Sequence, residues 1–253
     1  MATENKISVK NLNLFAGKQQ ILKDVNIVIP ENKITVVLGP SGCGKTSLLK
    51  CMNRLTDLYS DMKVDGNIFL DGEDILHTNS DITNIRMKMG LLSQKPYPLP
   101  VNIYHNVAYG LKLKGVKNKK EMDALVEHYL RQVNLWEEVK DRLKEPAVRL
   151  SLGQQQRLCL ARGLAVGPEI ILADEPTSSL DPISSKIIEE NFLALKQDYT
   201  IVMVTHILRQ ARRIADYVIF MYMGEVVEQA YAADFFENPK MERTRSYLSG
   251  MFN

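Results

Sequence analysis

The stretch KITVVLGPSGCGKTSLLKCMNRL, residues 33–55, decides the fold of this chain. It opens with a continuous apolar, β-branched run, which is typical of a parallel strand covered on both faces. It continues into GPSGCGKT, residues 39–46, which fits the G-x-x-x-x-G-K-[ST] pattern of a phosphate-binding loop. The remainder has the pattern of a helix. The order of strand, glycine-rich loop and helix predicts an α/β domain that binds phosphate groups.

The composition of this loop suits that chemistry. Glycines allow successive main-chain N–H groups to turn inward around phosphate oxygens, and the helix start adds a positive partial charge. Lys45 is expected to reach the β and γ phosphates, Thr46 to offer its hydroxyl to Mg²⁺, and Ser47 to lie near the α phosphate. The predicted nucleotide contacts are all nine residues of this segment: Gly39, Pro40, Ser41, Gly42, Cys43, Gly44, Lys45, Thr46 and Ser47. Cys43 is not expected to be a nucleophile, because no neighbouring histidine offers a base.

Two further buried strands are predicted at EIILAD, residues 169–174, and TIVMVTH, residues 200–206. Ligands of open α/β sheets gather at the carboxyl ends of the strands. At the first of these ends, Asp174 is expected to hold magnesium through its water shell and Glu175 to polarise the attacking water. At the second, His206 is expected to reach a γ phosphate and to fix the position of that water.

The remaining segments predict a smaller sheet and a helical insertion. Alternating residues 6–15 and 23–29 read as half-buried antiparallel strands, and residues 66–75 add a strand with a tight turn. Between about 95 and 165 apolar residues recur at helical spacing. The chain is therefore predicted to be a single domain over residues 1–253, with a catalytic core from 1–94 and 166–253 and a helical subdomain at about 95–165.

Composition narrows the function classes. The net charge is +2 over 253 residues, so nothing in it calls for a nucleic acid or an anionic membrane surface. The three cysteines are scattered, which indicates neither a disulfide framework nor a zinc site and fits a reducing compartment. No stretch resembles a secretion signal or a membrane span, so any action at a membrane is expected to depend on partner proteins.

The motifs in this order resemble those of the nucleotide-binding subunit of ATP-binding cassette (ABC) transporters. They are the phosphate loop, LSLGQQQR at 150–157, IILADEPTSSLD at 170–181 and VTH at 204–206. Residues 53–75, 94–113, 161–185 and 235–252, together with LWEEVKDRLKEPA at 135–147, resemble the ATP-binding proteins of phosphate importers. The resemblance covers essentially the whole chain.

This resemblance implies a fold and a set of partners. The fold would be a P-loop NTPase (RecA-like) core with an antiparallel β subdomain and a helical insertion. The chain would bind ATP and Mg²⁺ and form a homodimer on the cytoplasmic face of the plasma membrane. Two integral membrane permease subunits would join it there, with an extracytoplasmic phosphate-binding protein as an indirect partner. It would hydrolyse ATP to drive the uptake of inorganic phosphate.

The resemblance also implies roles for single residues. Ser151 and the main-chain N–H groups of Gly153 and Gln154 would grip the γ phosphate that the other subunit holds. Gln94 would contact magnesium and link the core to the helical insertion. Asp181 would lie in a loop that passes between the two sites of the dimer.

Three positions depart from the family pattern. Leu152 stands where glycine is usual, which matters if the backbone there needs a positive φ. Ala16 stands where an aromatic residue commonly stacks on adenine, and Phe15 is one position early, so Phe15 either stacks or is buried. Thr46 and Ser47 invert the commoner order but keep a hydroxyl at each position.

Other functions stay open. An importer for another solute, such as an amino acid or a different oxyanion, has the same motifs. A soluble ABC ATPase of translation or DNA repair is expected to show duplicated cassettes, a basic arm or a long coiled coil. A regulatory subunit without hydrolysis is suggested by Leu152, but the intact Glu175 and His206 argue against it.

Overall fold

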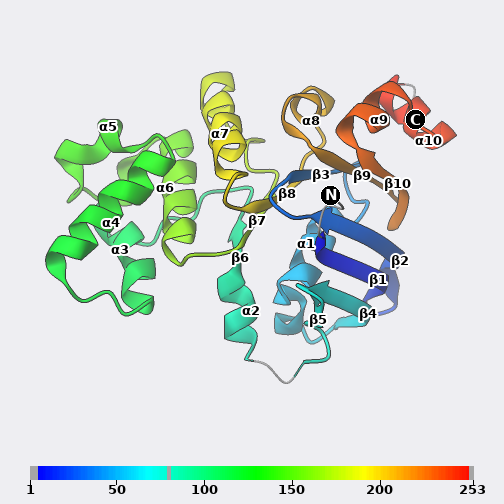
Figure 1. Cartoon of the computed structure of the whole chain (residues 1–253), viewed down its shortest axis with the longest axis horizontal. Helices are drawn as coiled ribbons and strands as arrows, with labels where there is room; N and C mark the ends of the chain where they lie inside the picture. Colours follow the sequence, from blue (N-terminus) through cyan, green and yellow to red (C-terminus); the bar gives the residue numbers. More distant parts are fainter. Residues whose placement is uncertain (1–4, 79–80, 251–253) are drawn as a thin grey trace. The chain divides into compact units, whose positions relative to one another are not determined.

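The computed structural model describes residues 5–78 and 81–250, and these form two compact units. The first unit comprises Met1–Arg86 and Tyr199–Asn253, and the second comprises Met87–Asp198. Helix α2 (Ile82–Lys88) spans the boundary in the sequence. Figure 1 shows the elements of both units with their labels.

The first unit contains an antiparallel sheet in the order β2-β1-β4-β5. Its strands are β1 (Asn5–Ala16), β2 (Gln19–Pro30), β4 (Met62–Leu70) and β5 (Glu73–Asp74). Inward-facing residues of β1 and β2 alternate with exposed ones, as the sequence pattern predicted. The short 3₁₀ helix η1 (Leu55–Leu58) precedes β4.

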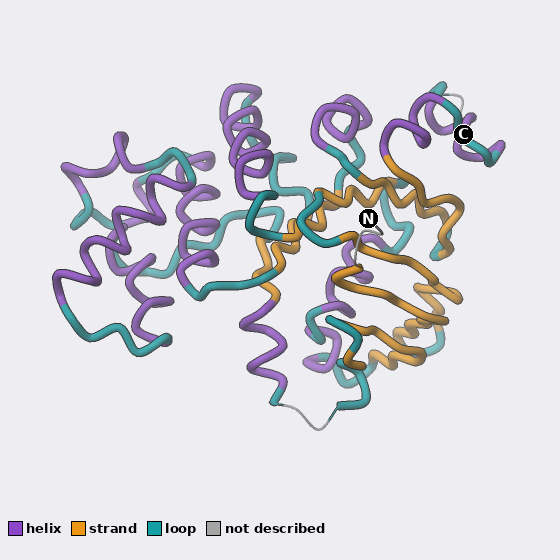
Figure 2. The backbone as a smooth tube through the Cα atoms, in the orientation of Figure 1, coloured by secondary structure: helices purple, strands orange, loops and turns teal. Residues whose placement is uncertain are grey.

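The same unit contains strands in the order β10-β9-β3-β8. β3 (Ile34–Leu38) pairs in parallel with β8 (Thr200–Val204) on one side and with β9 (Tyr217–Tyr222) on the other, and β10 (Glu225–Tyr231) is antiparallel to β9. Every residue of β3 and β8 is buried, which explains their unbroken apolar sequence. Figure 2 shows these strands in orange.

Four helices complete the first unit: α1 (Lys45–Met52), α8 (Leu208–Ile214), α9 (Ala232–Glu237) and α10 (Glu242–Leu248). The turn before α10 is fixed by Glu228 of β10. Its carboxylate oxygens accept hydrogen bonds from the main-chain N–H groups of Lys240 at 2.8 Å and Met241 at 3.1 Å. Helix α10 is therefore anchored to β10, the strand that pairs with β9.

The second unit joins two parallel strands to helices (Figure 1). The strands are β6 (Met89–Leu92) and β7 (Ile170–Asp174). The helices are α3 (Ile103–Leu113), α4 (Lys119–Gln132), α5 (Trp136–Val139), α6 (Leu152–Ala165) and α7 (Pro182–Leu195), with 3₁₀ turns η2 (Lys140–Arg142) and η3 (Ala147–Arg149). The predicted helical subdomain at about 95–165 lies inside this unit.

The predicted fold class is confirmed: parallel strands with helices, a separate antiparallel sheet and a helical segment are all present. Among the described residues, no helix is both long and apolar enough to cross a membrane.

Asn106 of α3 organises the loop that precedes that helix. Its side chain is fully buried, its Oδ1 accepts from the N–H of Leu99 at 2.8 Å, and its Nδ2 donates to the carbonyl of Asn102 at 3.0 Å. Arg162 of α6 donates to the same Oδ1 at 3.3 Å. One buried amide therefore holds residues 99–102 and α6 together.

Replacement of Asn106 by alanine leaves the main-chain N–H of Leu99 without its acceptor and removes the bond from Arg162, although the carbonyl of Asn102 still accepts from the main-chain N–H of residue 106. We expect Asn106→Ala to lower the free energy of unfolding by about 1–3 kcal/mol, measured by urea denaturation. Tyr109→Ala is the control, because Tyr109 lies on the same helix and is 52% exposed, and it should cost at most about 0.5 kcal/mol. Equal losses for the two variants would contradict this role of Asn106.

Candidate nucleotide site

The phosphate loop follows β3 and ends where α1 begins, as the sequence predicted. Gly39, Gly42 and Gly44 have φ angles of +153°, +78° and +101°, which side chains rarely adopt. A β-carbon on Gly39 would overlap the main-chain carbonyl oxygen of Met221, and one on Gly44 would lie 2.8 Å from Cδ2 of Leu22. Gly42 is open on that side. The three glycines are thus required for two reasons, backbone conformation at all of them and space at two.

The start of α1 suits an anion. Its N-cap is Gly44, which offers no side-chain acceptor, and its first turn contains no acidic residue. Helices of proteins usually cap their first N–H groups with a side-chain oxygen, and an uncapped start offers those groups to a ligand. Lys45 is 5% exposed, and its ammonium donates to the carbonyls of Gly39 and Pro40, both at 2.8 Å. The main-chain carbonyls of the loop therefore hold the ammonium of Lys45 in place.

Cys43 is buried inside this loop, and its Sγ lies 3.9 Å from Nζ of Lys45. Burial raises the pKa of the Cys43 thiol above its ordinary value, although the charge of Lys45 opposes the shift. The thiolate is therefore scarce at neutral pH, which agrees with the expectation that Cys43 is not a nucleophile.

Tyr247 of α10 lies beside the loop, which no sequence pattern predicted. Its ring stacks on Phe220 with 4.6 Å between ring centroids, and Phe220 is the β9 partner of Leu38, the last residue of β3. Burial raises the pKa of the Tyr247 hydroxyl, which accepts a hydrogen bond from the main-chain N–H of Gly39. The C-terminal helix thereby fixes the first glycine of the loop.

His206 lies in the same unit as the phosphate loop and follows the neighbouring parallel strand. Val204, the last residue of β8, is in register with Val37 of β3, and the N–H of Thr205 donates to the carbonyl of Val37 at 3.2 Å. The hydroxyl of Thr205 accepts from the N–H of Ile207 at 3.1 Å, which shapes the loop around the exposed His206. Both segments thus leave the sheet at carboxyl ends of adjacent strands, as predicted.

Phe15 is half-buried in β1, where it pairs with Gln20 of β2 and Lys63 of β4. The preceding Leu14 is fully buried, so the two side chains lie on opposite faces of the sheet. Neither full burial nor full exposure describes Phe15, and adenine stacking by it stays a prediction.

The acidic pair lies in the second unit. Asp174 ends β7, and Glu175 follows in a left-handed conformation with φ +45°. Most other non-glycine residues with positive φ in the described chain are Asn or Asp, which tolerate it, so a glutamate there stores about 1–2 kcal/mol of strain. Residues strained in this way cluster at functional sites in proteins. In this chain Arg54 and Met223, outside the predicted site, adopt the same conformation.

Gln94 is joined to the turn after Glu175. Its Nε2 donates to the hydroxyl of Ser178 at 3.0 Å, and the N–H of Ser178 donates to the carbonyl of Glu175 at 3.2 Å. The structure thus brings together two residues that lie 81 positions apart in the sequence. Ser178 was not among the predicted site residues, although it belongs to the quoted segment 170–181.

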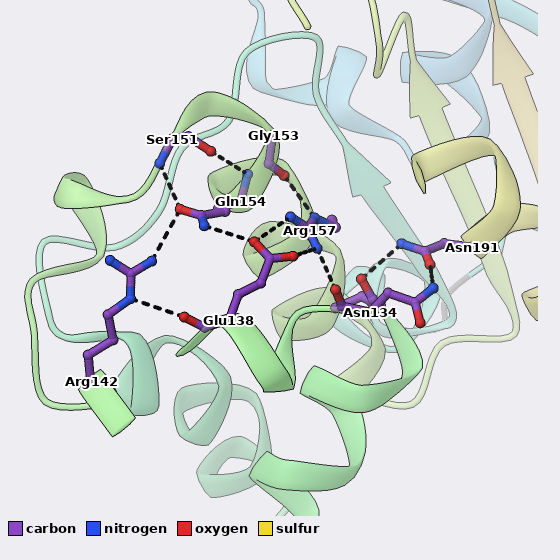
Figure 3. A network of polar contacts seen from close by, with 9 residues as sticks. Asn134, Glu138, Arg142, Ser151, Gly153, Gln154, Arg157 and Asn191 are labelled. Atoms are coloured by element: carbon purple, nitrogen blue, oxygen red, sulfur yellow. Dashed lines mark hydrogen bonds and ion pairs between the residues drawn. The ribbon is translucent and has the colours of Figure 1, made fainter. Parts of the chain in front are cut away.

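Ser151 caps α6. Its hydroxyl accepts from the N–H of Gln154 at 3.3 Å, and Oε1 of Gln154 accepts from the N–H of Ser151 at 3.0 Å, which is a complete capping box (Figure 3). This hydroxyl is exposed and sits at a helix N-terminus, which favours an anion. Capture of a phosphate there would share or replace the bond between Ser151 and the N–H of Gln154.

Leu152 does not strain the backbone. It is the first residue of α6, it is absent from the positions with positive φ, and its side chain is 52% exposed. The condition under which a leucine here would be unfavourable, a positive φ, is therefore not met, because this position is helical. What Leu152 adds is an exposed branched side chain beside Ser151.

The three glutamines after this turn fasten it to three different segments. Gln154 donates to Glu138 at 2.8 Å, Gln155 donates to the carbonyl of Leu150 at 2.8 Å, and Gln156 donates to the carbonyl of Ser93 at 2.9 Å. Gln156 is fully buried, and Ser93 directly precedes Gln94. These side chains therefore connect the turn at Ser151 to other segments of the same chain.

Asp181 is the N-cap of α7, where it accepts from the N–H groups of Ile183 and Ser184, both at 3.0 Å. The hydroxyl and N–H of Ser184 donate to its carboxylate and hold the pKa of Asp181 below its ordinary value. Gly153 lies against Ser184: a β-carbon on Gly153 would be 2.7 Å from Cβ of Ser184. The glycine of the turn is thus required by the close approach of α7.

Comparison with known proteins agrees with these motifs. Residues 22–178 match the family described as ABC transporter, so the chain belongs to that family. It is 29% identical to the ATP-binding cassette MJ0796, solved as a dimer in a post-hydrolysis state bound to ADP and Pi. That match has a TM-score of 0.77 and covers 89% of this chain and 98% of the other.

Two more distant structures share the fold. CbiO1 from Clostridium perfringens, part of the ABC transporter complex CbiONQ, is 24% identical with a TM-score of 0.81, over 98% of this chain and 97% of the other. A bacterial Atm1-family ABC exporter with ATP bound is 21% identical with a TM-score of 0.82, over 100% of this chain and 43% of the exporter. The chain has the ABC ATPase fold, and it is the ATP-hydrolysing part of a transporter.

The steric argument for the loop glycines can be tested. We expect Gly42→Ala to cost about 1 kcal/mol of stability, because only the backbone conformation resists it. Gly39→Ala should cost more, by about 1–3 kcal/mol, because its β-carbon also meets the Met221 carbonyl. Guanidinium denaturation measures both losses. A Gly39→Ala loss no larger than that of Gly42→Ala would contradict the close approach.

Proposed function

We propose that this chain is the ATPase subunit of an importer for inorganic phosphate. The observation that carries the nucleotide chemistry is the phosphate loop, where inward-turning glycines, an uncapped helix start and the buried Lys45 form a cradle for an anion. The transported ion rests on the resemblance of residues 53–75, 94–113, 135–147 and 235–252 to phosphate-import proteins. The two parts of the proposal therefore need separate tests.

In this proposal the loop binds the phosphates of ATP. Its main-chain N–H groups surround the phosphate oxygens. The ammonium of Lys45, which donates to the carbonyls of Gly39 and Pro40 in the structure, then donates to the β and γ phosphates instead. A magnesium ion takes most of its ligands from phosphates and water, so few protein groups suffice, and Thr46, Gln94 and Asp174 supply oxygen atoms of the right kind. When bound, the ion neutralises charge that develops on the phosphates.

The hydrolytic step is assigned to Glu175, which orients a water molecule and accepts its proton as the water attacks the γ phosphorus, while the bond from that phosphorus to the bridging oxygen breaks and ADP leaves. The hydroxyl of Ser178 holds Gln94 beside the turn that carries Glu175. His206 contacts the γ phosphate and keeps the water in line. Each of these side chains binds or orients a group, which is the main requirement of phosphoryl transfer.

Ser151, Gly153 and Gln154 act on the nucleotide of a second copy of the chain, and Asp181 lies between the two nucleotides. ATP then favours a closed homodimer, and hydrolysis releases it. Two membrane permease subunits convert the difference between open and closed shapes into uptake, with the dimer at the cytoplasmic face. An extracytoplasmic binding protein delivers phosphate to them.

The dimer is tested with Glu175→Gln, which should bind ATP and stall before hydrolysis. We expect ATP with Mg²⁺ to convert this variant from a monomer to a dimer, measured as molar mass by light scattering. Adding Leu152→Gly should strengthen the dimer, because it removes an exposed side chain next to Ser151. If neither variant forms a dimer with ATP, the proposal is contradicted for the isolated chain. If Leu152→Gly does not strengthen the dimer, the side chain of Leu152 does not weaken dimer closure.

The substrate is tested by transport. A tagged copy of the chain is purified from the source organism with the membrane subunits that accompany it. The complex is placed in proteoliposomes with ATP inside and the extracytoplasmic binding protein outside. We expect uptake of radiolabelled phosphate over sulfate and amino acids, and Glu175→Gln should abolish it. ATP-driven uptake of another solute in place of phosphate would refute the phosphate assignment while preserving the importer.

A further inference from the structure

Glu138 of α5 contacts the turn that contains Ser151, although it was not among the predicted site residues. Its Oε2 accepts from Nε2 of Gln154 at 2.8 Å, and its two oxygens accept from Arg157 at 2.6 and 3.0 Å (Figure 3). We propose that Glu138 is a positioning residue that sets the geometry of Ser151 for binding a nucleotide. This inference rests on the proposed role of Ser151 toward a partner subunit's ATP.

The first step concerns the amide of Gln154. Its Oε1 accepts from the N–H of Ser151 at 3.0 Å and from Arg142 at 3.4 Å, whereas its Nε2 faces the carboxylate of Glu138. An ionised carboxylate only accepts hydrogen bonds, so it admits only the NH₂ end of that amide. Glu138 thus fixes the amide in the orientation that the capping box requires.

The second step concerns Arg157, whose side chain is 4% exposed. Its guanidinium donates to the carbonyl of Gly153 at 3.4 Å and to the carbonyl of Asn134, besides Glu138. A buried guanidinium without a counter-charge is strongly unfavourable. Burial opposes the ionisation of Glu138, but hydrogen bonds from Arg157 and Gln154 outweigh it and keep its pKa below the ordinary value. The carboxylate is therefore charged at neutral pH.

The third step links the same segment to α7. Nδ2 of Asn134 donates to Oδ1 of Asn191 at 2.6 Å, and Nδ2 of Asn191 donates to the carbonyl of Val133 at 3.0 Å. Asn191 lies on the helix that Asp181 caps. Residues 133–138 therefore contact both the turn at Ser151 and the helix that follows Asp181. We expect a change at Glu138 to alter the positions of both.

The matched pair for the experiment is Glu138→Gln and Glu137→Gln. Glu137 is the adjacent residue on α5, and it bonds to Arg131 at 2.9 Å and Lys140 at 2.6 Å on the exposed surface. Each change removes one negative charge from the same helix, but only Glu138→Gln reaches the turn. Both are placed in the Glu175→Gln background, and ATP affinity, dimer formation and hydrogen exchange at residues 151–156 are measured.

We expect Glu138→Gln to weaken ATP-driven dimerisation about tenfold or more, to speed exchange at residues 151–156, and to leave ATP affinity of the monomer unchanged. Glu137→Gln should change none of these, and Glu138→Asp, which keeps the charge, should restore most of the dimer. A loss of ATP affinity matching the loss of dimer would indicate a general structural role and overturn the inference. So would a dimer that is unaffected by Glu138→Gln.

The two proposals fail in different ways. If the parental Glu175→Gln variant does not dimerise with ATP, the proposed action of Ser151 on a partner's nucleotide fails. Exchange at residues 151–156 then still decides the role of Glu138: equal rates in Glu138→Gln and Glu137→Gln overturn it. If Glu138→Gln does not fold, the residual defect of Glu138→Asp supplies the comparison, because the shorter side chain keeps the charge but cannot reach Gln154 and Arg157 equally well. Exchange at residues 151–156 in Glu138→Asp that is no faster than in Glu137→Gln then overturns the inference.

Discussion

Much of the first unit follows from one structural requirement: after β3 the chain must turn through glycines at positive φ into a helix start whose first N–H groups have no side-chain cap. The loop meets it with three glycines at positive φ and a first helical turn that has no acidic residue, and its carbonyls hold the Lys45 ammonium inside the loop. The surrounding first unit serves that requirement. The carbonyl of Met221 and the side chain of Leu22 leave no space for a side chain at Gly39 or Gly44, and Tyr247 holds the N–H of Gly39. The loop is thus shaped from outside as well as by its own sequence.

The turn at Ser151 differs from the phosphate loop in how its helix start is capped. There the helix start is capped by a side chain, and the cap itself is the group proposed to meet a phosphate. Such a hydroxyl must stay exposed while everything beneath it is rigid. The three glutamines and Arg157 provide this by tying the turn to α5, to residues 148–150 and to Ser93. Gln156 in particular connects α6 with the residue before Gln94, so two predicted site segments share a buried bond.

How far the sequence predicted this arrangement depended on the range of the interactions. The phosphate loop, the buried strands and the spacing of Ser151 and Gln154 are local patterns, and local patterns are readable because periodicity and capping act over a few residues. The partners of those residues were not readable. Glu138 lies 16 positions from Gln154, and Tyr247 lies 208 positions from Gly39, so only the tertiary fold brings them together.

Leu152 shows why a departure from a family pattern needs the backbone before it can be interpreted. A glycine position suggests a positive φ, yet here the position is the first residue of a helix, and the actual steric restriction falls one residue later at Gly153, against Ser184. Glu175 shows the reverse case: nothing in the sequence predicts a positive φ there, yet the residue adopts φ +45° directly after a buried strand. In both places the backbone, set by packing of α7 and β7, decides which side chain is constrained. The sequence identifies the chemical groups. The packing determines which of them lie on a strained backbone and which have no space for a larger side chain.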